Sequence, residues 1–133
     1  MESNPKYAMT RITLSLLFLL SGSFTAAQAA ESATTKAEIA HLFTVLETSN
    51  CQFNRNGFWH DAKDAATHLH TKYQYLQNLN LVSSTEKFIN RAASESSFSN
   101  KAYQIKCADN VVQRSAPWFT AALLKYRSTL KAN

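Results

Sequence analysis

The sequence predicts a mainly α or α+β domain, with about four helices and a short two-stranded β-ribbon in a single compact unit. Four stretches place apolar residues three and four positions apart, as amphipathic helices do. Two shorter stretches alternate apolar with polar residues, as half-buried strands do. Each of these two stretches contains one cysteine, Cys51 or Cys107, and a bond between them would hold the strands side by side.

The first 29 residues have the three-part pattern of a secretion signal, so the folded domain is expected over residues 30–133. Basic Lys6 and Arg11 precede an apolar run, and small residues end in Ala27-Gln-Ala29. The apolar run of about nine residues is shorter than the about 20 that a membrane span needs. We therefore expect cleavage after Ala29, no stable membrane span, and a periplasmic or secreted protein. An uncleaved anchor is the alternative.

The first helix is expected over residues 35–48. Thr35 and Glu38 have the spacing of a capping box, in which two side chains satisfy free amide groups at a helix N-terminus. The apolar residues that follow recur with helical spacing and predict a face toward the core: Ile39, Leu42, Phe43 and Leu46.

A short strand is expected to begin at Cys51 and to lead into a tight turn at Asn56-Gly57, a dipeptide typical of turns. Gly57 is the only glycine after the leader, so we expect a positive φ there. The longest helix is then predicted over residues 61–76, with Asp61 as its N-cap. Its inner face would consist of Ala62, Ala65, Ala66, Leu69, Tyr73 and Leu76.

Three more elements complete the predicted domain. A short helix follows a second capping box at Ser83-Ser-Thr-Glu86. A second strand is expected over residues 102–107, where Tyr103 and Ile105 alternate with polar residues. The last helix opens at Ser115-Ala-Pro117, because proline is tolerated in a first turn.

Cys51 and Cys107 are the only cysteines, and outside the reducing cytoplasm we expect them to bond to each other. Closing a loop of about 57 residues would stabilise the fold by roughly 4 kcal/mol. A redox-active or metal-binding pair is the alternative, but the chain has no CxxC spacing.

Composition narrows the possible functions. The net charge of +5 is scattered, with no run of three basic residues, whereas nucleic-acid binders concentrate Lys and Arg on one face. We therefore expect no nucleic-acid partner. The chain has no Walker loop, no GxGxxG and no GxSxG turn, so we expect no cofactor and assign no catalytic residue. Enzymatic activity stays open, and a protein that is not an enzyme is favoured.

A weak metal site is conceivable on the 61–76 helix and the residue before it. His60, Asp64 and His68 follow one another at intervals of four, so they point to roughly the same side. Imidazole and carboxylate groups are suitable zinc ligands. However, the outer two would be about 12 Å apart along the axis, so only adjacent pairs could chelate one ion. We favour a solvated polar face and predict no metal.

Arg55 and Asn56 lie on the turn, between Phe53 and the pair Phe58-Trp59. A guanidinium beside aromatic rings is well suited to bind a carboxylate, a phosphate or a sugar. The alternative is structural, with Arg55 packed on Trp59.

Several strings in the chain occur together in one known family. They are Phe53-Asn-Arg-Asn-Gly57, His60, Ala65, His68-Leu69-x-x-Lys72, Ser84-Thr-Glu-Lys-Phe-Ile89, Ala93-Ser-Glu-Ser-Ser97 and Ala102-Tyr-Gln-Ile105. With them the chain resembles the YfeK-like family of small exported proteins of Gram-negative bacteria, a domain of unknown function. The resemblance extends over residues 39–127, and it implies location and fold rather than an activity.

The polar positions of the YfeK-like family correspond to Arg55, Asn56, His68 and Lys72 in this chain. One hypothesis is that these residues line a site for an unknown periplasmic protein or a small anionic or polar ligand. The other is that they anchor the loop before the 61–76 helix. We therefore expect a non-catalytic binding or interaction module. A small metal-dependent hydrolase and an inhibitor of an extracellular enzyme are the alternatives.

Overall fold

The computed structural model of the chain describes residues 29–132. The predicted leader lies outside these residues, except for Ala29. Within residues 29–132, no helix combines the length and the apolar character that crossing a membrane requires.

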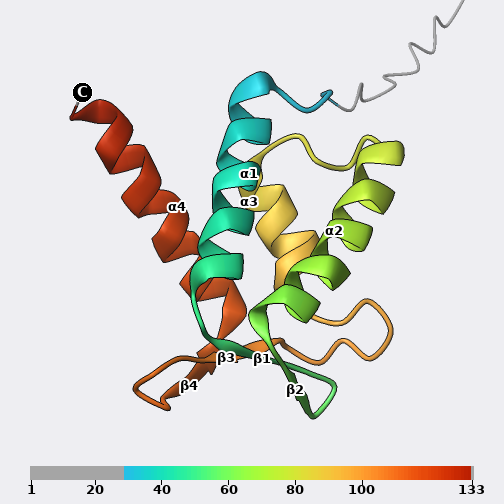
Figure 1. Ribbon diagram of the computed structural model, residues 1–133. Coiled ribbons are helices and arrows are strands. Elements are labelled where there is room, and N and C mark those ends of the chain that lie inside the picture. Colours follow the sequence, from blue (N-terminus) through green and yellow to red (C-terminus); the bar gives the residue numbers. More distant parts are fainter. Residues whose placement is uncertain (1–28, 133) are drawn as a thin grey trace, which may run out of the picture.

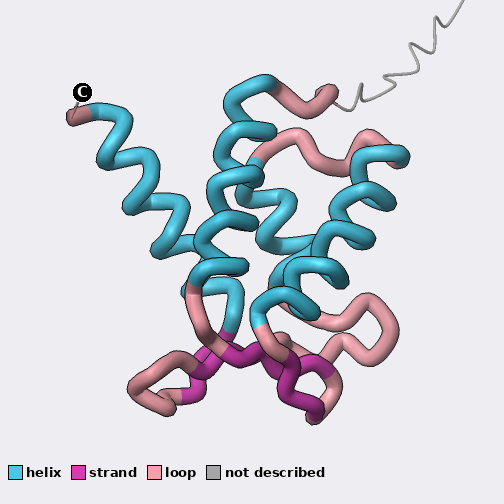
Figure 2. The backbone as a smooth tube through the Cα atoms, in the orientation of Figure 1, coloured by secondary structure: helices cyan, strands magenta, loops and turns pink. Residues whose placement is uncertain are grey.

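The domain consists of helices that stand on one side of a small antiparallel sheet (Figure 1). The helices are α1 (Ala33–Thr48), α2 (Ala62–Asn78), α3 (Thr85–Phe88), which continues as the π-helix η1 (Ile89–Ala93), and α4 (Ser115–Lys131). The strands, in their order across the sheet, are β2 (Phe58–His60), β1 (Gln52–Arg55), β3 (Gln104–Lys106) and β4 (Val112–Arg114). Figure 2 shows that all four strands gather at one end of the helices.

The predicted fold class is confirmed, but the sheet has four strands where the sequence predicts two. The two predicted strands, β1 and β3, pair antiparallel in the centre. β2 and β4 flank them, each paired antiparallel with one central strand. Neither flanking strand lies in a stretch that alternates apolar with polar residues, as residues 102–107 around β3 do. The sequence therefore predicts the segment of β4 as a link.

The turn between β1 and β2 has the predicted conformation. The φ angles of Asn56 and Gly57 are 54° and 91°, and positive values at both central residues are typical of a type I′ hairpin turn. The Asn54 side chain supports the turn, because its Oδ1 accepts a hydrogen bond from the Gly57 N–H at 3.0 Å.

The predicted disulfide between Cys51 and Cys107 is present. Gln52 pairs with Lys106 in the sheet, so the two cysteines are the next opposed pair along the β1–β3 ladder. Their Cα atoms are 4.2 Å apart. The bond therefore holds together the two central strands at the end where β1 begins.

The first helix begins earlier than predicted. Ser32, not Thr35, is the N-cap of α1, and its Oγ accepts from the Thr35 N–H at 3.0 Å. Glu38 does not turn back to the helix end. Its carboxylate is buried and binds Arg127 of α4 and the Thr85 hydroxyl of α3. A tertiary ion pair has thus replaced the expected local cap.

The other helix starts agree closely with the sequence. Asp61 caps α2, accepting from the Asp64 N–H at 2.9 Å. Ser84 caps α3 within the predicted capping box, and Pro117 lies in the first turn of α4. The core lies between the helices and the inner face of the sheet, and its largest fully buried apolar side chains are Phe88, Phe119, Ile39, Leu42, Leu46, Ile105, Leu123 and Val82.

Candidate functional site

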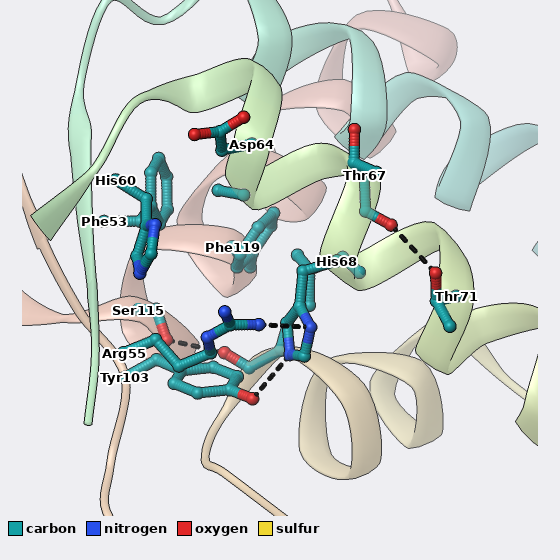
Figure 3. A pocket seen from close by; sticks show the side chains of 13 residues that line it. Phe53, Arg55, His60, Asp64, Thr67, His68, Thr71, Tyr103, Ser115 and Phe119 are labelled. Atoms are coloured by element: carbon teal, nitrogen blue, oxygen red, sulfur yellow. Dashed lines mark hydrogen bonds between the residues drawn. The ribbon is translucent and has the colours of Figure 1, made fainter. Parts of the chain in front are cut away.

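A cavity of about 390 Å³ lies between α2 and the inner face of the sheet (Figure 3). Its apolar wall includes Phe53, Leu69 and Phe119, which also belong to the core. Its polar side chains come from β1, β2, α2, the start of α4 and the residue before β3: Arg55, His60, Asp64, Thr67, His68, Thr71, Tyr103 and Ser115. The cavity therefore combines an apolar body with a polar side.

Arg55 and His68 make the central contact of this polar side. Nη1 of Arg55 lies 2.5 Å from Nδ1 of His68. A guanidinium can only donate, so Nδ1 must accept and the imidazole must be neutral, with its proton on Nε2. This bond joins β1 to the middle of α2.

The second nitrogen of His68 continues the chain of hydrogen bonds. Its Nε2–H donates to the hydroxyl oxygen of Tyr103 at 3.0 Å. Figure 3 shows Arg55 and Tyr103 both directed at the imidazole ring. Tyr103 is buried, and burial raises the pKa of its phenol, so it remains a neutral hydroxyl. Both ring nitrogens of His68 are thus occupied by protein groups.

Lys72 lies one turn after His68 on α2 and meets the same hydroxyl. Its Nζ is 3.4 Å from the Tyr103 hydroxyl and 5.0 Å from the centre of the Tyr103 ring. It also donates to the backbone carbonyl of Glu95 at 2.8 Å, so it ties α2 to the loop before β3. Burial lowers the pKa of Lys72 to about 8, which the nearby Glu95 carboxylate partly opposes.

The protonation of His68 follows from its surroundings. Burial is the main cause that lowers the pKa of His68, to about 4, and the positive charges of Arg55, Lys72 and His60 lower it further. The pKa of His68 thus agrees with the neutral tautomer that the Arg55 contact requires.

Arg55 has no carboxylate partner among residues 29–132. The ion pairs there join Glu47 to His70, and Arg127 to both Glu38 and Glu86, all away from the cavity. Asp64 is the one acidic residue in the cavity lining, and it makes no ion pair with Arg55. The polar side of the cavity therefore presents a guanidinium that has no carboxylate within ion-pair distance in residues 29–132.

The structure brings together three of the four polar residues that the sequence singles out. Arg55, His68 and Lys72 meet around Tyr103. Asn56 does not join them, because it lies at the exposed hairpin tip, where its Oδ1 accepts from the Ser99 hydroxyl at 2.5 Å. It links the hairpin to the loop of residues 94–103.

The candidate metal ligands lie beside the cavity without forming a cluster. His60, Asp64 and His68 all line it. Nevertheless, within the described part of the chain no three or more His, Cys, Asp or Glu residues are placed to hold a metal ion. Asp64 and His68 lie on α2, whereas His60 belongs to β2, so the three residues do not share the helix face that their spacing predicts.

Sequence reasoning did not assign Tyr103 to the site. Its alternation with Ile105 places both on the inner side of the strand region, and both are buried. That pattern could have indicated a residue facing α2, but the partners of its hydroxyl are 35 and 31 positions earlier in the chain. Only the folded arrangement reveals them.

Comparison with known proteins identifies one family. A model described as "Family of unknown function (DUF5329)" matches residues 33–127. No curated protein and no solved structure matches the chain. The matched segment begins with the first residue of α1 and ends at Arg127 in α4, so it contains the sheet and the whole cavity. The chain belongs to this family, DUF5329.

Proposed function

We propose that the protein is a non-catalytic binding module whose cavity takes a small molecule with a carboxylate or similar anionic group. The observation that carries the proposal is the Arg55 guanidinium, which lines the cavity without a carboxylate partner in residues 29–132. His68 occupies one of its five N–H donors, which leaves enough for a two-point contact with an anion.

The shape and lining of the cavity indicate the rest of the ligand. Its volume of about 390 Å³ is near the lower end of the range for small-molecule sites. Phe53, Leu69 and Phe119 offer a surface for an apolar group. Thr67, Thr71 and Ser115 supply hydroxyls beside it. A compact organic acid is therefore a better fit than a bare inorganic ion.

The hydrogen bonds of His68 favour binding over metal-dependent hydrolysis. A metal ion at His68 would have to displace either Arg55 from Nδ1 or Tyr103 from Nε2. The same bonds also join β1 and the residue before β3 to α2, so anchoring and ligand binding are compatible. In this proposal His68 orients Arg55, and Arg55 makes the ionic contact.

Calorimetric titration with benzoate and hexanoate, compared with benzyl alcohol and hexanol, tests the carboxylate requirement. We expect the acids to bind and the alcohols to bind at least tenfold more weakly, because a hydrogen bond to a charged group contributes about 1.5–3 kcal/mol. The variant Arg55→Ala should lose most of the difference between acid and alcohol. Equal affinities for the two classes in the unmodified protein would overturn the proposal.

Two controls separate loss of the site from loss of the fold. Lys63→Ala removes a positive charge from an exposed position of α2 and should leave acid binding unchanged. Thermal unfolding of Arg55→Ala shows whether enough folded protein remains for titration. If Arg55→Ala stays folded and binds the acids as tightly as the unmodified chain, the role assigned to Arg55 is wrong.

We also propose that the chain is exported and processed, in keeping with the resemblance to YfeK-like proteins. The support is the order of basic, apolar and small residues up to Ala29. Mass spectrometry of the protein from an expressing bacterium should give a chain that begins at Ala30 and is recovered with the periplasmic fraction. A product that retains Met1 would contradict this.

A further inference from the structure

The face of the sheet opposite the helices carries a set of polar side chains. One row of paired residues crosses the four strands and consists of Trp59, Asn54, Gln104 and Arg114. In a second row, Lys106 lies opposite Val112. Opposed residues in an antiparallel sheet point to the same face, and neighbours along a strand point to opposite faces. Figure 1 shows the helices on one side of the sheet. Phe53 and Ile105 are buried against the core, so these two rows face the other way.

This outer face is cationic. Lys106 and Arg114 lie on it, and none of the outward positions of the four strands is Asp or Glu. Diagonal neighbours on paired strands are about 7–8 Å apart, which is the spacing expected between Lys106 and Arg114. The ammonium of Lys106 lies 4.5 Å from the centre of the Trp59 ring, so one cation is held over the sheet rather than extended into solvent.

The remaining side chains suit a ligand rich in hydroxyl groups. Gln104 and Asn54 provide amide groups between Trp59 and Arg114, although the Asn54 oxygen also accepts from the Gly57 N–H. Trp59 is 36% exposed, and its ring offers an apolar surface beside these polar groups. Amide side chains can donate to and accept from hydroxyls, and Lys and Arg bind carboxylates.

From this combination we propose that the outer face of the sheet binds an acidic polysaccharide. Its carboxylates would bind Lys106 and Arg114, its hydroxyls would bind the amides, and a sugar ring would pack on Trp59. Single-stranded nucleic acids bind sheets by stacking successive bases on several aromatic rings, and the outer face has one. A protein interface has an apolar core, whereas Trp59 and Val112 are the sole apolar side chains here.

Affinity electrophoresis of the mature protein through gels containing polygalacturonate tests the proposal. Polygalacturonate should retard the protein and dextran, a neutral polysaccharide, should not. The double variant Lys106→Ala, Arg114→Ala should weaken binding at least tenfold, and Trp59→Ala should also weaken it. The matched variant Lys36→Ala, Lys87→Ala removes two exposed lysines from α1 and α3 and should bind as the unmodified chain does.

Three results would overturn the proposal: equal loss in both double variants, equal retardation by polyglutamate, or tighter binding of an oligodeoxythymidylate. The first two would show attraction of any polyanion, and the third would show a nucleic-acid surface. Circular dichroism of each variant establishes that the compared proteins are folded. Arg55→Ala should leave polygalacturonate binding unchanged, so failure of the cavity proposal and failure of this one can be told apart.

Discussion

His68 connects three segments of the chain through one imidazole ring. It belongs to α2, accepts from Arg55 of β1 and donates to Tyr103 beside β3. The contact with Arg55 requires the neutral ring, because a protonated Nδ1 could not accept from a guanidinium. A single proton at His68 would therefore break the contact that orients Arg55.

The stability of the protein should fall in mild acid because of His68. The pKa of His68 is 6.5 in the unfolded chain and about 4 in the folded one. Between these values the unfolded chain takes up a proton that the folded chain does not, so the free energy of unfolding decreases as the pH falls from 6.5 toward 4.

Urea unfolding at pH 7 and pH 4.5 measures this effect. His68→Gln removes the titrating group while an amide can still donate to Tyr103. The unmodified protein should lose more stability between the two pH values than His68→Gln does. An equal loss in both proteins would show that other groups cause the acid sensitivity.

A side chain at Gly57 should destabilise the protein because of the backbone conformation there. Its φ is +91°, while a Cβ built there would meet no atom within 4 Å. Gly57→Ala should therefore destabilise the fold by about 1 kcal/mol through backbone strain alone. Thermal unfolding measures the change, and a melting temperature equal to or above that of the unmodified chain would contradict it.

At the scale of elements, Glu38 and Arg127 join the first helix to the last. Arg127 donates through Nε and Nη2 to the two carboxylate oxygens of Glu38, at 2.7 and 2.8 Å, and through Nη1 to Glu86 of α3. The bond to Arg127 is the main cause that lowers the pKa of Glu38, against the opposing effect of burial. The Glu38 side chain is 7% exposed and that of Glu86 is 57% exposed.

The two carboxylates should differ in their contribution to stability. Glu38→Ala leaves the buried Thr85 hydroxyl without its acceptor and removes two of the three hydrogen bonds of Arg127, so it should destabilise the protein by about 3 kcal/mol. Glu86→Ala removes an exposed ion pair and should change stability by less than about 1 kcal/mol. Chemical unfolding of both variants measures the difference, and similar losses would contradict this account.

The helices could be predicted because their signals are local. Apolar spacing and the Asp61 cap are contained within a few turns of chain, and α2 forms as they indicate. β2 and β4 could not be predicted, because their residues do not alternate apolar with polar and the two strands form by pairing with β1 and β3. The prediction that Glu38 caps the first helix is wrong, because its partner Arg127 is 89 positions away in the chain and gives no local signal.

The candidate site was predictable in part. The motif residues Arg55 and His68 do meet, 13 positions apart in the chain. Asn56 follows Arg55 in sequence, but the hairpin turn directs it to Ser99 instead of the cavity. Sequence proximity alone therefore did not indicate which of the two residues faces the cavity.

For the molecule as a whole, the disulfide should supply a large part of the stability. Cys51 and Cys107 are 56 positions apart, and a loop of this length is expected to contribute about 4 kcal/mol by restricting the unfolded chain. Cys51→Ala, Cys107→Ala should therefore unfold at a much lower urea concentration than the oxidised protein. Free thiols that titrate in the oxidised protein before any reductant is added would contradict the bridge.

The direction of α4 has a practical consequence. The helix leaves the sheet at Ser115 and extends for 17 residues, about 25 Å, to Lys131. Its end lies at the opposite pole from the strands (Figure 1). A tag or biotin attached after α4 would tether the protein to a sensor chip with the outer face of the sheet, including Trp59 and Arg114, turned toward the flowing solution, so immobilised protein can report on polysaccharide binding without obstruction.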